Sequence, residues 1–346
     1  MNCYRCHSAL SHKSHKCDKC GQEVFSTYTA GQLSHGRRLD GCLHDEPSAT
    51  DYRAMANVSS LPFSVDLRND CSPVEDQGQI GSCVANAIVG AFEHQLKRDG
   101  KPMRDFSRMF VYYNARKILG DPSFDNGATI SAGMAAMLAF GAPTESRWPY
   151  QVESYAKPPS PEVYQEAGSN VPREYARVDG LDGVKGALAR RYPVVIAVNI
   201  PERVYQAAGE TGMAPQPTRA EVDNIRTRNG RHALLVVGYD QNSGMLTLRN
   251  SWGEGWGDRG YFKMSMDTFN EVLAPNTTWI LGRLEANDFT MVRPPRSSTA
   301  PEAPKVEGGV KDMAEKMRNE IRDGLKKDIQ DSFKDIKERM KPRQGQ

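Results

Sequence analysis

Four polar residues, spread over about half of the 346-residue chain, most constrain what this sequence can fold into. Cys83 stands at the head of a stretch whose apolar residues recur at helical spacing, and Gln77 lies six residues before it. His232 and Asn250 lie at the ends of two strand-like runs. A thiol, a base, an orienting amide and an oxyanion donor are the groups needed to attack an amide carbonyl. We expect the fold to bring all four to one cleft.

The position of Cys83 suits a nucleophile. It follows Gly81 and Ser82, which favour a turn into the start of a helix. A thiol in the first turn lies at the positive end of the helix dipole, and a nearby imidazolium would favour the thiolate further. Taken alone, a cysteine such as Cys83 is more often a buried structural residue that packs like a small hydrophobe. His232 and Asn250 favour the catalytic interpretation.

His232 is the one histidine that follows His94 in the sequence. The amide oxygen of Asn250 is predicted to accept a hydrogen bond from Nδ1 of the imidazole, which would leave Nε2 facing the thiol. Trp252 is expected to cover this contact and exclude water. The side-chain amide of Gln77 and the backbone N–H of Cys83 are expected to form an oxyanion hole.

Several stretches together resemble the papain-like cysteine peptidases over about residues 61–286. These stretches are 61–68, 77–85, 141–150, 231–240 and 249–262. The separation of the cysteine and the histidine, about 150 residues, is at the upper end of the family range. The resemblance implies an α+β fold of two lobes, a helical lobe carrying Cys83 and a β-barrel-like lobe carrying His232 and Asn250. It also implies a cysteine endopeptidase that acts on proteins or peptides through an acyl-enzyme intermediate, with no cofactor for catalysis.

The departures from the family pattern concern the cleft. Ile80 and Val84 replace a cysteine and a tryptophan that usually flank the nucleophile. Gly127 is the counterpart of one glycine of the family's Gly-Gly pair, so it is expected to bind substrate backbone, and Trp252 is expected to line the substrate site. Arg231 stands where a small or acidic residue is common. It could bias the cleft toward acidic side chains or be an exposed arginine without a role, and both interpretations stay open.

The coarse secondary structure agrees with two lobes. Apolar spacing predicts helices over 83–98, 107–118 and 131–140, all in the first half of the proposed domain. Runs rich in β-branched residues predict strands in the second half, over 194–199, 233–239, 245–250 and 261–266.

The first 21 residues hold two cysteine pairs with metal-binding spacing. The candidate ligands are Cys3, Cys6, Cys17 and Cys20. Two such pairs give tetrahedral sulfur ligation, so residues 1–21 resemble a zinc ribbon with one structural zinc ion. Redox-active pairs or a reduced tail are the alternatives. Residues 22–60 are expected to be a linker. This head is too short for the long helical inhibitory prosegment of secreted relatives, so we expect the ribbon or a partner to control activity.

The C-terminal part changes composition. Residues 287–309 are expected to be a proline-rich linker. Apolar residues recur every three or four positions over 310–341, with charges of both signs on the other face, which predicts one long amphipathic helix. Self-association as a coiled coil or binding of a protein partner is the first expectation for this helix. Packing on the enzyme comes second, and a membrane surface comes third.

Composition narrows the partners and the compartment. The net charge of +2 gives no electrostatic argument for nucleic acid, although the basic stretch 13–19 keeps an adaptor role as a minor alternative. No apolar run approaches the roughly 18 residues of a membrane span, and the N-terminus lacks the apolar core of a secretory signal. The distribution of the seven cysteines suits a reducing compartment. We therefore expect the cytoplasm, with signal-independent export left open.

Two other functions share the same residues. An isopeptidase or transpeptidase would use the same thiol and acyl-enzyme but a different acceptor, which the mass of the product distinguishes. An inert peptidase-like scaffold would act by partner binding, which covalent labelling of Cys83 would contradict.

Overall fold

The computed structural model describes residues 19, 33–34, 37–45, 51–57, 59–226, 231–292 and 319. The four cysteines of the expected zinc ribbon, residues 293–309 of the expected linker and all but one residue of the expected C-terminal helix lie outside these ranges. Within them, no three or more His, Cys, Asp or Glu side chains are grouped to hold a metal ion. The same residues include no helix long and apolar enough to span a membrane.

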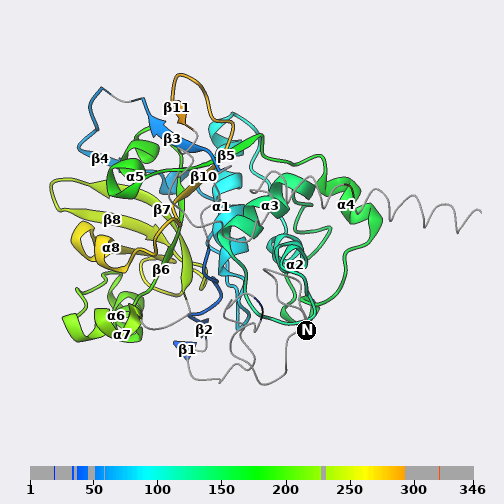
Figure 1. The fold of residues 1–346 in the computed structure, drawn as a ribbon, viewed down its shortest axis with the longest axis horizontal. Coiled ribbons are helices and arrows are strands. Elements are labelled where there is room, and N and C mark those ends of the chain that lie inside the picture. The colour runs from blue at the N-terminus through cyan, green and yellow to red at the C-terminus, as the bar shows by residue number, and fades with distance from the viewer. Residues whose placement is uncertain are drawn as a thin grey trace, which may run out of the picture.

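One side of the molecule is helical (Figure 1). Helix α1 (Cys83–Arg98) runs through the centre, and α2 (Arg108–Ile118) and α3 (Ile130–Phe140) pack beside it. The side chains of Ser107 and Thr129 cap α2 and α3 by accepting backbone N–H groups. Gly133 of α3 lets the two helices approach closely, because a Cβ there would lie 2.5 Å from Ile88 of α1. The hydrophobic core therefore extends along the buried residues of α1 as far as Cys83.

The other side is a sheet of nine strands. Eight of them follow the order β11-β3-β5-β10-β6-β7-β8-β9, and β4 pairs with β7. Their bounds are β3 (Arg53–Ala56), β4 (Ser64–Asp66), β5 (Glu174–Arg177), β6 (Val194–Val198), β7 (His232–Asp240), β8 (Met245–Arg249), β9 (Tyr261–Ser265), β10 (Trp279–Gly282) and β11 (Phe289–Val292). Strands β6 to β9 are antiparallel, and β7 is buried along almost its whole length because α1 packs against it.

The remaining helices are short; some lie on the sheet side of the molecule, and one lies beyond α3 on the helical side (Figure 1). They are α4 (Pro161–Ala167), α5 (Gly180–Ala189), α6 (Glu202–Thr211), α7 (Arg219–Arg226), α8 (Met266–Val272) and the 3-10 turns η1 (Arg68–Asp70) and η2 (Val152–Ser154). A separate two-stranded pair, β1 (Leu33–Ser34) and β2 (Arg37–Arg38), lies near α6. Residues 37–45, which include β2, lead from there into the space between the helices and the sheet.

The three predicted helices and the four predicted strands agree with the structure to within one or two residues at each end. The expected linker 22–60 is wrong in part, because β3 joins the main sheet between β11 and β5. Strand β11 likewise extends the sheet beyond residue 286. These strands have four residues each, which is too short for an alternating pattern to be seen. The described strands also form an open path rather than a closed barrel.

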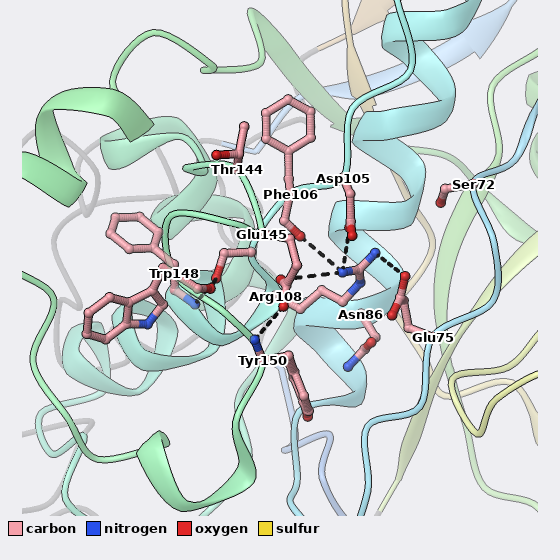
Figure 2. Close-up of polar contacts among 12 residues, drawn as sticks. Ser72, Glu75, Asn86, Asp105, Phe106, Arg108, Thr144, Glu145, Trp148 and Tyr150 are labelled. Atoms are coloured by element: carbon pink, nitrogen blue, oxygen red, sulfur yellow. Dashed lines mark hydrogen bonds and ion pairs between the residues drawn. The ribbon is translucent and has the colours of Figure 1, made fainter.

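A buried ionic network braces the helical side (Figure 2). The guanidinium of Arg108, 2% exposed, donates to Asp105 at 2.9 Å and to Glu75 at 2.8 Å. It also lies 3.6 Å from the carboxylate of Glu93, which is fully buried. Burial raises the pKa of Glu93, and the charge of Arg108 opposes this. Arg108 therefore compensates a carboxylate that water does not reach.

This network predicts a stability effect for Arg108→Met. The change should lower the free energy of unfolding by about 3–5 kcal/mol, because it leaves a buried carboxylate without its cation. Arg219→Met removes a 3.3 Å ion pair with Asp223 at the surface and should change it by less than about 1 kcal/mol. Chemical denaturation of both variants measures the difference. Equal losses in the two would contradict the role of Arg108.

Candidate active site

The packing of α1 against β7 brings Cys83 beside the start of the strand that His232 begins. Cys83 is the first residue of α1 and His232 the first of β7, and both side chains are almost completely buried. The backbone amide of Ala233, the residue after the histidine, lies close enough to the thiol to oppose the rise of its pKa. The sulfur thus lies at the first turn of a helix and at the edge of the strand that carries the base.

The imidazole of His232 is held by Asn250. Its Nε2 lies 2.8 Å from Oδ1 of Asn250, whereas its Nδ1 is buried and has no hydrogen-bond partner. The predicted pair is therefore found, but the predicted assignment of the two nitrogens is wrong. Asn250 directly follows β8, whose pairing with β7 sets Leu235 opposite Arg249, and its amide oxygen lies on the Nε2 side of the ring. Nδ1 is the nitrogen left for the thiol.

Two aromatic rings fix the plane of the imidazole. The ring of Trp252, 4% exposed, lies 5.1 Å from that of His232. Tyr205 of α6 meets the imidazole at 84° and 5.6 Å, and also contacts Trp252 at 5.2 Å. Tyr205 is a site residue that the sequence analysis missed. A single tyrosine on a short amphipathic helix carries no local signal of this contact.

Gln77 is fully buried beside the same helix start. Its side-chain nitrogen donates to the carbonyl of Ile80 at 2.8 Å, and its oxygen accepts from the hydroxyl of Ser251 at 2.6 Å. The hydroxyl of Tyr150 donates to the Gln77 carbonyl at 2.8 Å, and the Tyr150 backbone N–H donates to Glu145. The amide group is thus held in one orientation. Glu145 lies 3.7 Å from Arg108, so the ionic network of Figure 2 reaches this loop.

Residues 37–45, here called the strap, run between the two walls of the site. On the sheet side, the N–H of Cys42 donates to the carbonyl of Arg231 at 2.8 Å, and the N–H of Arg231 donates back at 3.2 Å. On the helical side, the N–H of Ala128 donates to Gly41 at 3.0 Å, and the N–H of Leu43 donates to Ala128 at 2.9 Å. The strap therefore occupies the cleft as an added strand, antiparallel to residue 231 and parallel to residue 128.

The strap passes directly over the nucleophile's loop at Gly41. A Cβ at Gly41 would lie 2.8 Å from backbone atoms of Gly81, two residues before Cys83. The antiparallel pairing of Cys42 with Arg231 places Gly41 opposite His232. A residue without a side chain is therefore required where the strap crosses the reacting groups.

Polar contacts hold both ends of the strap. Arg38, 8% exposed, donates to Asp125 at 2.7 Å, and Asp125 in turn accepts the N–H of Gly81 at 2.9 Å. At the other end, the carboxylate of Asp45 accepts the N–H of Ser131 at 2.8 Å and its hydroxyl at 2.6 Å. The strap lies within the region that we expected to be a linker. The expectation of a linker is therefore wrong for residues 37–45, which pair with residues 128 and 231.

The structure also corrects the role expected for Gly127. Its N–H donates to the hydroxyl of Tyr112 at 3.2 Å, so it does not point into the cleft. The residue that pairs with the strap through both its N–H and its carbonyl is Ala128. Gly127 instead permits close approach, because a Cβ there would lie 2.3 Å from the Gly41 carbonyl.

Burial beneath the strap favours the uncharged forms of both Cys83 and His232. Burial raises the pKa of the Cys83 thiol to about 12 and lowers the pKa of His232 to about 4, although the hydrogen bond to Asn250 opposes the second shift. Both groups are therefore neutral at pH 7 while the strap is in place. An exposed thiolate–imidazolium pair would require water or substrate in place of the strap.

Comparison with known proteins agrees with this architecture. The model of the family described as "Papain family cysteine protease" matches residues 61–278. An uncharacterized peptidase C1-like protein of Acanthamoeba polyphaga mimivirus is 30% identical over 217 residues, which are 60% of this chain and 68% of that protein. Cathepsin K of Gallus gallus is 30% identical over 252 residues, 69% of this chain and 67% of its own.

Solved structures show the same fold. Xylellain, a cysteine protease from Xylella fastidiosa, superposes with a TM-score of 0.62 at 30% identity, covering 72% of this chain and 98% of that one. Bromelain from Ananas comosus superposes with a TM-score of 0.51 at 20% identity over 64% and 99% of the two chains, a likeness of fold alone. This chain belongs to the papain family of cysteine proteases, and it is a hydrolase.

Proposed function

We propose that this papain-family protease is a latent cysteine endopeptidase whose reaction is carried by Cys83, His232, Asn250 and Gln77. The observation that supports this best is the state of the His232 ring. Asn250 engages Nε2, and the buried Nδ1 has no partner beside the helix start that holds the thiol. An oriented base with one unused nitrogen next to a thiol is the arrangement that activates a nucleophile.

The reaction follows from these positions. Cys83 transfers its proton to Nδ1 of His232, and the thiolate attacks the peptide carbonyl. The N–H of Cys83 and the amide of Gln77, which commits one of its two N–H bonds to Ile80, stabilise the oxyanion. His232 then gives its proton to the leaving amine, and water hydrolyses the thioester with His232 again as the base. Asn250 keeps the ring oriented throughout.

Latency follows from the strap. An extended peptide binds by adding a strand to exposed backbone edges, and the edges here are those of Ala128 and Arg231. The strap already uses both, so a substrate has to displace it. The strap itself is a poor substrate, because the Gly41 carbonyl is engaged by Ala128 while the Gln77 amide donates to Ile80. The covering segment and the cleaved peptide therefore compete for one groove.

The zinc ribbon and the C-terminal helix stay proposals that rest on residue spacing alone. A zinc ion held by Cys3, Cys6, Cys17 and Cys20 would fold a segment that ends shortly before the strap. Docking of that segment on a partner would shift the strap out of the cleft, so the zinc segment would control activity through the position of the strap. Self-association through 310–341 would be an independent property.

Gly41→Ala should activate the full-length chain. The added Cβ meets the Gly81 backbone at 2.8 Å, and such overpacking costs about 1–3 kcal/mol, which here falls on the closed strap. Peptide hydrolysis and alkylation of Cys83 should both rise about tenfold or more. Gly168→Ala is the matched control, because its nearest neighbours would be 3.6 Å away, and it should change neither rate. Unchanged alkylation in a folded Gly41→Ala protein would contradict the latency.

Cys83→Ala, made in the Gly41→Ala background, should abolish hydrolysis, with a loss of about 10⁶-fold in kcat. Labelling by a thiol-directed epoxide should vanish while thermal unfolding stays cooperative. Cys71→Ala removes the half-buried cysteine outside the cleft and should keep both hydrolysis and labelling. Hydrolysis that survives loss of Cys83 would show that another residue is the nucleophile.

A further inference from the structure

The side chain of Cys42 is fully buried in the cleft, but it offers no strong hydrogen-bond acceptor to the polar groups around it. Its thiol makes one weak contact, 3.7 Å from the carbonyl of Leu43. The ionisable side chains near it include those of Cys83, Asp45, Arg231 and Tyr205. Cys42 thus lies where a substrate residue next to the reacting groups would lie.

The walls of this place present donors that have no acceptor. The hydroxyl of Tyr205, 1% exposed, has no hydrogen-bond partner. The Nε and Nη1 atoms of Arg231 are buried and also have none. An arginine offers only donors, and an unpaired buried donor is costly to keep. The ligand that these groups lack is an acceptor, and beside a guanidinium it is an anionic one.

Other acceptors near Cys42 are already committed. The carboxylate of Asp45 accepts two hydrogen bonds from Ser131 and belongs to the strap, so it leaves with it. The carbonyl of Arg231 accepts the N–H of Cys42. The unpaired donors therefore lie near Cys42 without an acceptor from the described residues.

The two donor residues are fixed against the catalytic base. Tyr205 rests on the His232 ring at 5.6 Å and on Trp252 at 5.2 Å, so its hydroxyl has a set position beside the reacting groups. Arg231 directly precedes His232, the first residue of β7. A side chain bound by both belongs to a residue near the scissile bond.

We propose that Arg231 and Tyr205 form a subsite for an acidic substrate side chain, Asp or Glu, within two residues of the cleaved bond. The proposal rests on the proposed function, since it names the substrate preference of the same cleft. The carboxylate accepts from the guanidinium and from the phenol hydroxyl, two charge-assisted hydrogen bonds in a water-poor place. Cys42 offers no such acceptor, so an acidic substrate gains contacts that the strap does not have. This resolves the question that the sequence left open about Arg231.

The test uses the full-length Gly41→Ala protein and peptides that differ only in Glu or Gln at each position around the cleaved bond. The Glu peptide should have a kcat/KM about tenfold higher at one of these positions. Arg231→Gln should bring this ratio near one, by lowering kcat/KM for the Glu peptide. Tyr205→Phe, which keeps the ring on His232, should reduce the ratio several-fold. Arg283→Gln removes an equal charge from the surface pair with Glu285 and should leave it unchanged.

Matched peptidyl epoxides with Glu or Gln separate this proposal from the proposed function, because labelling of Cys83 needs no hydrolysis. Peptides cleaved with a Glu-to-Gln ratio near one, or a ratio that Arg231→Gln leaves intact, would overturn the subsite and keep the peptidase. Epoxides that discriminate while no peptide is cleaved would support the subsite and overturn the peptidase. Absence of both cleavage and labelling would overturn both.

Discussion

The packing of helix α1 against strand β7 is the contact on which the rest of the site depends. It sets the first residue of the helix, Cys83, beside the first residue of the strand, His232. The register of β7 with β8 then delivers Asn250 to the far nitrogen of the ring. The remaining features brace this arrangement, because the Arg108 network holds one flank of the nucleophile's loop and Asp125 holds the other.

The same construction shows how a segment of the chain's own N-terminal part occupies the backbone edges of the site. A cleft built for an extended peptide has two backbone edges, and any chain segment that can pair with both will compete. The strap does so with four backbone hydrogen bonds, and Gly41 lets it pass over the reacting groups. Gly41 has no side chain there, and the Cys42 thiol makes one weak contact with the carbonyl of Leu43. A substrate that satisfies Arg231 and Tyr205 therefore differs chemically from the segment it replaces.

The sequence predicted the helices, the strands and the candidate catalytic residues that are marked by a pattern of neighbouring residues. The helices at 83–98 and 131–140 and the strand at 233–239 follow from apolar periodicity, which a single sequence displays. Gln77, Cys83, His232 and Asn250 stand out because their residue types and order are rare in combination.

The features that the sequence did not predict depend on pairing between distant backbones. Cys42 lies between Ala128 and Arg231 through main-chain bonds, which any residue can make, so no pattern marks the strap. The choice between the two imidazole nitrogens depends on where the fold places Asn250. The lack of a hydrogen-bond partner for the Tyr205 hydroxyl likewise depends on the folded structure and leaves no pattern in the sequence. The backbone pairing expected of Gly127 is made by Ala128, because the direction of one N–H decides between them.

Amide hydrogen exchange in the intact chain tests most directly whether the cleft is closed by its own segment. The amides of Cys42, Leu43, Ala128 and Arg231 each donate to the opposite strand of the strap pairing. We expect these four to exchange slowly and at one common rate, as members of a single opening unit. Exchange of Cys42 and Leu43 at the rate of an unstructured peptide, with Ala128 and Arg231 equally unprotected, would show that the strap does not occupy the cleft in solution.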